Sequence, residues 1–394
     1  MSYTFGVLFF VIALLVSVML HEAGHFLTAR AFGMKASRFF VGFGPTLWST
    51  HRGETEYGVK AIPAGGFVKI VGMTDLEEIE PGDEDRAFYR QPAPQRLVVL
   101  SAGSVVHFII AIFLLFVVLA MTGDILKADP TLKISSVSSC VPLNPNATSC
   151  AASDPKAPAF GKIHPGDKVV AVNGTPVSSY DDMRARISSS PGRPVTLQVI
   201  RDGKAVAITL TPLAIRQGSQ TIGRIGVSPL FRQHPLSVAG AVPRTFTTLG
   251  EMTVQTGRAL GDLPHQVSDI LQGKPRAATG AASVVDIARV SGQIAQAKVS
   301  FGTRLANLIA IVAQLNFFVG VFNMLPLLPL DGGHVAIVLF EQTRSRLYRL
   351  FGRRDPGRVD LMKIMPFTYA VVAVFVGLSL LLLYAGIVNP IRIQ

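Results

Sequence analysis

The sequence predicts a polytopic α-helical membrane protein with four transmembrane helices, a β-hairpin and an inserted α+β domain. The chain has 394 residues, of which 49% are hydrophobic, and a mean hydropathy of +0.42, which is too apolar for a soluble globular protein. Its apolar residues gather in four segments long enough to cross ~30 Å of hydrocarbon, which takes about 20 helical residues. We expect these helices near 5–29, 97–121, 305–325 and 367–387.

Basic residues flank these segments, and the net charge of +12 therefore indicates membrane topology and not a nucleic-acid partner. No Lys or Arg precedes Arg30, which favours a membrane anchor over a signal peptide for the first segment. The positive-inside rule places 31–96 and the Arg-rich loop after the third helix in the cytoplasm. We therefore expect a multi-pass protein of the cell membrane, with both termini and the region 122–304 extracytoplasmic.

The only two cysteines, Cys140 and Cys150, both lie in the region expected outside the cytoplasm. An oxidising compartment would let them form a short disulfide. The sequence leaves two unpaired thiols open as the alternative.

The first segment, 1–30, carries His21-Glu22-Ala23-Gly24-His25 within its apolar helix. Residues four apart share one face of an α-helix, so His21 and His25 can bind one Zn²⁺ while Glu22 acts on a bound water. A charge near the bilayer centre costs about 2.5–3.5 kcal/mol on insertion scales, and such a cost favours a functional role.

A catalytic zinc needs three protein ligands and an open position. The candidates for the third ligand are His107, Asp331, His334 and Glu341. Asp331 is favoured, because it follows the third helix within Asn323-Met324-Leu325-Pro326-Leu327-Leu328-Pro329-Leu330-Asp331-Gly332-Gly333. Irregular backbone at membrane depth is tolerated only where it lines a protein cavity, and a carboxylate there calls for a cation. The segment 305–335 is therefore expected to contain the third transmembrane helix and, after it, the candidate zinc ligand Asp331.

Two other segments contain β-sheet signals. Short apolar alternation around Pro63, Gly65 and Gly66 predicts a hairpin at about 55–72, within the cytoplasmic segment 31–96. In the region 130–230, Gly166-Asp167, Val172-Asn173-Gly174 and the turn at Asp202-Gly203 resemble a PDZ domain. A PDZ domain binds extended peptides by strand addition, so a peptide ligand is expected unless the domain only blocks or spaces. Residues 236–272 have helical spacing, and we expect 236–300 to be an extracytoplasmic amphipathic helical segment that packs against the protein more than against the membrane.

These motifs occur in the order typical of the site-2 protease family of intramembrane metalloproteases (peptidase family M50). The chain resembles the bacterial regulator-of-sigma-E type in a single-PDZ form like that of actinobacteria. The resemblance covers nearly the whole chain, from HEAGH through the Pro-Ala-Gly-Gly-Phe hairpin and the PDZ-like region to the Asn…Leu-Asp-Gly motif. The fourth transmembrane helix, expected at 366–388, follows this motif. The resemblance implies one zinc held by His21, His25 and Asp331, and catalysis by Glu22.

The resemblance also implies a substrate site. Asn323 would contact the substrate backbone, and the hairpin at Gly65, Gly66 and Phe67 would dip into the membrane and pair with an unwound substrate strand. The implied substrates are single-pass membrane proteins, such as an anti-sigma factor already trimmed by another protease. The second helix, 97–121, departs from the family's Gly-Pro-x-x-Asn, because Ser104 and His107 stand in place of its Pro and Asn.

Two other classes of function remain open. A zinc transporter would need acidic or His residues along several helices, whereas the sequence has one compact cluster. A catalytically idle PDZ adaptor would not require an intact HExxH motif together with Asp331. Metal content distinguishes the adaptor from the other two, and peptide-bond cleavage distinguishes a protease from a transporter.

Overall fold

The computed structural model describes residues 1–73, 79–123, 129–143, 150, 153–217, 220–232, 235–274, 276, 281–297 and 299–389. The chain divides into two compact units. The membrane unit comprises Met1–Met121, Val238–Arg276 and Gly280–Ile391, and the β-rich unit is formed chiefly by Thr122–Ser237. Each unit is described by itself.

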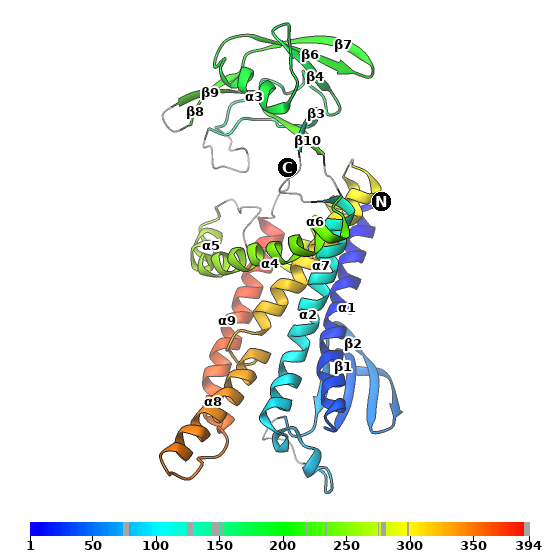
Figure 1. The fold of residues 1–394 in the computed structure, drawn as a ribbon, viewed down its shortest axis with the longest axis vertical. Helices are drawn as coiled ribbons and strands as arrows, with labels where there is room; N and C mark the ends of the chain where they lie inside the picture. Colours follow the sequence, from blue (N-terminus) through cyan, green and yellow to red (C-terminus); the bar gives the residue numbers. More distant parts are fainter. Residues whose placement is uncertain are drawn as a thin grey trace. The chain divides into compact units, whose positions relative to one another are not determined.

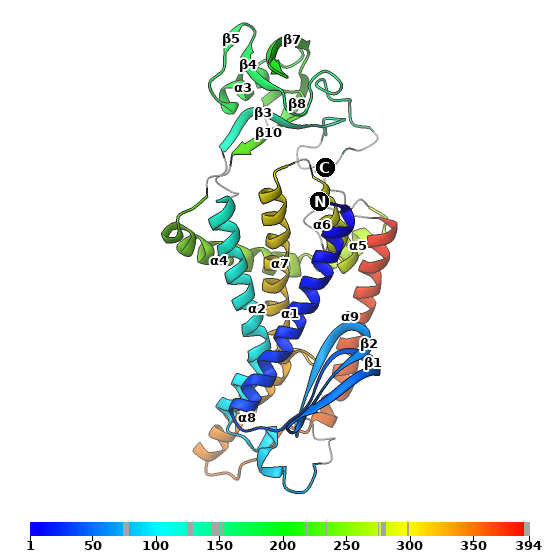
Figure 2. The same ribbon diagram turned by 90° about the vertical axis from the view of Figure 1, so that its right-hand side faces the viewer.

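Among the described residues, four helices of the membrane unit are long and apolar enough to cross a bilayer, as the sequence predicts. They are α1 (Tyr3–Ala31), α2 (Ala93–Thr122), α7 (Phe301–Asn323) and α9 (Leu361–Val388). Helices α1, α2 and α7 run side by side (Figures 1 and 2). The buried residues of α1 include Phe10, Ser17, His21 and Gly24, which recur every three, four or seven positions and so lie on one face. The opposite face is apolar and exposed, as expected for contact with lipid.

The third apolar segment is interrupted at the predicted place. Helix α7 ends at Asn323, and α8 (Asp331–Leu350) begins at Asp331, with a turn between them. A Cβ added at Gly332 would lie 2.3 Å from the carbonyl oxygen of Leu325, and one at Gly333 would lie 2.6 Å from the amide nitrogen of Leu328. Only glycine fits there, so the Gly-Gly pair allows the turn to pack against the first turn of α8.

The predicted hairpin is part of a longer sheet. Strands β1 (Ala36–Arg52) and β2 (Thr55–Ile70) are each bent, with Gly42 at φ +86° and Gly65 at φ +132°. Residues 36–41 pair on one side with 56–59 and on the other with 66–70, while 46–52 pair with 55–60. The result is a mixed sheet of four segments, in the order 46–52, 55–60, 36–41 and 66–70, in which each outer segment is antiparallel to its neighbour and the two central segments run in the same direction. Figure 2 shows this sheet beside α1.

The segment 236–300 forms three helices: α4 (Val238–Gly261), α5 (Leu263–Leu271) and α6 (Val284–Gln296). Helix α6 packs on α1, since a Cβ on Gly6 would lie 2.2 Å from the carbonyl oxygen of Ser291. Helices α4 and α5 bury little of their surface within the membrane unit. Only Ala241 and Thr245 are buried on α4 and no residue is buried on α5, which leaves their apolar stripes exposed. Helix α4 runs across the direction of α2 and α7 (Figures 1 and 2).

The β-rich unit is a mixed α+β domain. Its main sheet has the order β10-β3-β4-β6-β7, with β5 paired to β4, and β8 pairs with β9 in a separate hairpin. Helix α3 (Tyr180–Ser188) contributes Met183 and Ile187 to the core. The strands are β3 (Asp129–Val137), β4 (Lys168–Val172), β5 (Thr175–Pro176), β6 (Val195–Arg201), β7 (Lys204–Leu210), β8 (Leu213–Gln217), β9 (Gln220–Arg224) and β10 (Val227–Arg232).

Two 3₁₀ turns, Glu84–Arg86 and Phe88–Arg90, belong to the membrane unit.

The motifs quoted from the β-rich unit have structural roles within it. Asp202 (φ 49°) and Gly203 (φ +80°) form the tight turn between β6 and β7, as predicted. The buried carboxylate of Asp167 accepts hydrogen bonds from Arg201 Nε at 2.9 Å and from the His164 backbone N–H. The Arg201 guanidinium holds the pKa of this carboxyl below its usual range.

Cys140 and Cys150 form a disulfide, with their Cα atoms 6.0 Å apart. The sequence left open whether these cysteines are bonded or are two unpaired thiols, and the structure shows that they are bonded. These are the only two cysteines of the chain, and because they are bonded to each other the chain has no free thiol.

Candidate metal centre

Helix α1 presents His21 and His25 from its buried face. The Nδ1 atom of His25 lies 2.7 Å from the carbonyl oxygen of Val99 on α2. A carbonyl oxygen only accepts, so Nδ1 carries the hydrogen and donates it. In the neutral ring Nε2 then keeps its lone pair, which is the tautomer that a metal ligand needs.

Three donor atoms converge on one point between α1 and the start of α8. The Nε2 atoms of His21 and His25 are 3.2 Å apart, and each lies 3.4 Å from Asp331 Oδ2. A tetrahedral zinc with bonds of about 2.0–2.1 Å requires neighbouring ligand atoms about 3.3–3.4 Å apart. Asp331 Oδ2 is buried and has no hydrogen-bond partner among the residues that the structure describes. An orphaned carboxylate oxygen between two imidazole lone pairs fits a divalent cation.

Glu22 follows His21 on α1 and is half-buried. One carboxylate oxygen, Oε2, accepts a hydrogen bond of 3.1 Å from the backbone N–H of Val68 on β2. Glu22 is therefore a carboxylate directly next in the chain to His21, which belongs to the three-donor group.

The comparisons with known proteins agree with this geometry. The model of peptidase family M50 matches residues 9–354. The chain belongs to peptidase family M50. It is also similar along its full length to the zinc metalloprotease Rip1 of Mycobacterium tuberculosis, with 39% identity and 100% of both chains covered. The Rip1 of Mycolicibacterium smegmatis is 38% identical, again over 100% of both chains.

Gly103 of α2 completes the M50 site by leaving room for the imidazoles. A Cβ at this position would lie 2.4 Å from His21 Cε1 and 2.4 Å from His25 Nε2, the atom that faces the metal position. The sequence indicated Gly103 only as part of a family motif, because the face of α2 that meets α1 is not visible in the sequence.

Gly103→Ala is therefore expected to weaken zinc binding by about 10–100-fold. This is the loss typical when groups around a metal site are displaced. The added methyl group would overlap both ligand imidazoles. Zinc affinity of the purified chain measures the effect. Ser104→Ala is the matched control, because no described residue forms a hydrogen bond with the buried Ser104 hydroxyl and its removal should leave zinc in place. Equal zinc affinity in the two variants would contradict this role of Gly103.

His107, a candidate for the third ligand, has a different partner. Its Nδ1 lies 2.8 Å from Asn316 Oδ1 on α7. The Asn316 amide nitrogen donates to the carbonyl oxygen of Val312 at 2.8 Å and to Ser17 Oγ at 3.0 Å. Because the Val312 oxygen can only accept, it fixes the orientation of the amide, and Nδ1 of His107 must be the donor. The His107 ring lies 5.0 Å from that of His21 but is not part of the three-donor group.

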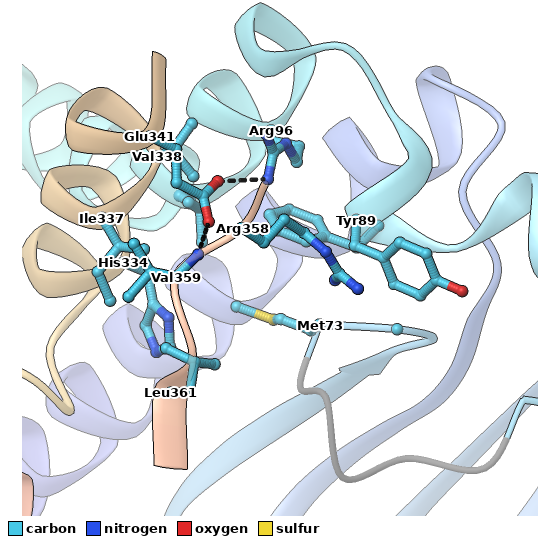
Figure 3. Close-up of a pocket in the computed structure, with 13 residues that line it drawn as sticks. Met73, Tyr89, Arg96, His334, Ile337, Val338, Glu341, Arg358, Val359 and Leu361 are labelled. Carbon is cyan, nitrogen blue, oxygen red and sulfur yellow. Dashed lines mark hydrogen bonds and ion pairs between the residues drawn. The ribbon is translucent and has the colours of Figure 1, made fainter. Parts of the chain in front are cut away.

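The other two candidates, His334 and Glu341, line a separate cavity of about 50 Å³ (Figure 3). Glu341 Oε2 lies 3.4 Å from Arg96, and Oε1 accepts the backbone N–H of Val359 at 2.9 Å. Both carboxylate oxygens are therefore occupied away from the metal position. The geometry favours Asp331 over all three alternatives.

The predicted substrate residues lie on two elements, α7 and β2. Asn323 is the last residue of α7, directly before the turn that leads to Asp331. Gly65, Gly66 and Phe67 lie at the bend of β2 and just after it, and the Phe67 ring stacks on that of Phe40 with centroids 5.6 Å apart. The sequence did not indicate Val68, whose backbone contacts Glu22.

Proposed function

We propose that this zinc metalloendopeptidase of family M50 cleaves single-pass membrane proteins within their transmembrane segments. The observation that carries the proposal is the group of His21, His25 and Asp331, which lies on the apolar helix α1 and at the end of a broken membrane segment. A protease whose ligands lie on membrane helices acts on peptide bonds at membrane depth. An anti-sigma factor already trimmed by another protease is the substrate type that the family resemblance favours.

His21, His25 and Asp331 would hold the zinc, and Glu22 is the proposed general base. When bound, zinc supplies a Lewis acid that polarises the scissile carbonyl and acidifies a water molecule. Glu22 accepts the proton of the attacking water and returns it to the leaving amine. Val99 holds His25 in the required tautomer through its carbonyl oxygen, and Gly103 leaves room for both rings.

The substrate must unwind locally, because an α-helix holds its peptide groups in internal hydrogen bonds. We propose that the edge of β2 at Gly65, Gly66 and Phe67 pairs with the unwound strand and that Asn323 binds its backbone. Exposed apolar side chains support insertion of the sheet into the membrane, since Leu47 is 69% and Trp48 is 59% exposed. Contact with lipid would shield both side chains from water.

The β-rich unit is proposed to be a PDZ domain that binds a peptide by strand addition. Its sheet with one packed helix, and the turns at Gly166-Asp167 and Asn173-Gly174, support this assignment. The disulfide supports an extracytoplasmic location, because such bonds are rare in the cytosol. With the Arg-rich loops inside, both termini lie outside and the metal site lies toward the cytoplasmic side of the membrane.

Cleavage of a purified single-pass reporter tests the function. The reporter is incubated with enzyme in liposomes, and mass spectrometry locates the cut. We expect a cut inside the transmembrane segment, loss of cleavage with a zinc chelator, and recovery when zinc is restored. A zinc-containing chain that cleaves nothing would favour the transporter, and a chain without zinc would favour the adaptor. A cut only outside the apolar segment would contradict intramembrane proteolysis.

The proposed topology predicts which engineered cysteines an impermeant thiol reagent can reach in intact cells. Ser189→Cys in the β-rich unit should be labelled, and Thr343→Cys on α8 should be labelled only after the membrane is opened. Both side chains are accessible, and the two native cysteines do not react because they are joined to each other. The opposite labelling pattern would place the β-rich unit in the cytoplasm.

A further inference from the structure

The backbone of β2 touches the catalytic carboxylate directly. Val68 lies in the last segment of the sheet, 66–70, which pairs with 36–41 on one side only. No strand among the described residues pairs with its other side. The Val68 N–H leaves the sheet on that outer side and donates to Glu22 Oε2 at 3.1 Å.

The direction of this N–H follows from the strand register. Phe67 is paired with Phe40, and Val68 with Phe39. The N–H groups of successive residues in an antiparallel strand point to opposite sides, so residues 67 and 69 turn toward β1 and residue 68 turns outward. The bond to Glu22 therefore uses an edge group and takes nothing from the β1–β2 ladder.

Packing fixes this edge against α1 on both sides of the bond. A Cβ at Gly66 would lie 2.7 Å from Met19 Sδ and 2.8 Å from the carbonyl oxygen of Phe40, so only glycine permits this approach. On the other side, Ile70 is buried in a cluster with Ala29 and Met34, and Val68 packs against that cluster. The segment is thus held at a fixed distance from one turn of α1.

We propose that the Val68 backbone N–H is a positioning group for Glu22. By holding Oε2, it directs Oε1 toward the water that Glu22 deprotonates, so strand β2 is part of the catalytic apparatus as well as a docking edge. The inference rests on the proposed function of Glu22 as the base. A carboxylate on a flexible side chain is otherwise free to rotate, and a misplacement of about 1 Å can cost about a hundredfold in rate.

Val68→Pro tests the inference, with Val68→Ala as its matched control. Proline removes the N–H, and an outward-facing edge position is one where a strand tolerates proline. Alanine keeps the N–H and, like proline, lacks the branched side chain of Val68. We expect kcat of Val68→Pro to fall about 10–100-fold below that of Val68→Ala, with KM changed less than about twofold. Zinc should stay at one per chain in both.

A second variant keeps the test decisive if proline disturbs the fold. Replacing Val68 by its α-hydroxy acid exchanges only the N–H for an ester oxygen and keeps the side chain, and kcat should fall in the same range. Substrate capture is compared between Glu22→Gln and Glu22→Gln/Val68→Pro, and equal capture is expected. A normal kcat in the ester variant, a change confined to KM or capture, or loss of zinc would each overturn the inference.

These results also separate the inference from the proposed function. If Glu22→Gln retains full activity, Glu22 is not the base and the proposed mechanism fails. If Glu22→Gln is inactive while the ester variant has normal kcat, the mechanism stands and only the positioning role of Val68 fails.

Discussion

Asp331→Asn is expected to lose zinc and peptidase activity together. A neutral amide is a poor zinc ligand, and within the described part of the chain Asp331 Oδ2 has no hydrogen-bond partner that could explain its burial. We expect zinc affinity to fall by more than about a hundredfold. Changing a residue that only hydrogen-bonds to a ligand typically costs up to about a hundredfold, and Asp331 is expected to be a ligand itself. Zinc per chain and reporter cleavage, both measured on the detergent-purified variant, check the prediction.

His107→Asn is the matched control, because it changes a buried residue whose ring lies 5.0 Å from that of His21. It restores the residue usual in the family and keeps a polar side chain opposite Asn316. Zinc and activity should both be largely retained. If His107→Asn lost its zinc while Asp331→Asn kept it, the third ligand would be misassigned.

Glu22→Gln is expected to remove cleavage while one zinc per chain remains. Both imidazoles and Asp331 are untouched, and the amide oxygen of the substituted side chain can still accept the Val68 N–H. An amide cannot take up the proton of water, and general-base catalysis is typically worth about 10²–10⁴-fold. Steady-state cleavage and metal analysis on the same preparation measure the two effects. Full activity would refute the assignment of the base.

Much of the site could be predicted from local sequence, because the relevant spacing lies within one helix or one turn. The i, i+4 spacing of His21 and His25 requires only that 5–29 be helical, and its apolar run ensures this. The end of α7 at Asn323 follows from the prolines and glycines after it. The hairpin turn at Asp202-Gly203 depends on two residues alone.

Other features could not be predicted, because they depend on which helix faces meet. Gly103 is one glycine among 36, and only the crossing of α1 and α2 shows that it faces two ligands. His107 and Asn316 are 209 residues apart in the sequence, so their hydrogen bond is a property of the tertiary fold. The sheet was predicted only at about 55–72, because glycines at 42 and 44 interrupt the alternation of β1 and hide its pairing.

The position of the metal site along α1 has a consequence for the fate of the products. His25 lies six residues before the end of α1 at Ala31, which corresponds to about 9 Å along the helix. Under the proposed function, a substrate span of about 20 apolar residues would be cut at that depth into a shorter and a longer piece. Because membrane retention grows with each buried CH₂ by about 0.8 kcal/mol, the shorter piece is weakly held. We expect the fragment on that side to diffuse into the aqueous phase while the longer stub stays in the bilayer, so a single hydrolysis converts an anchored protein into a soluble one.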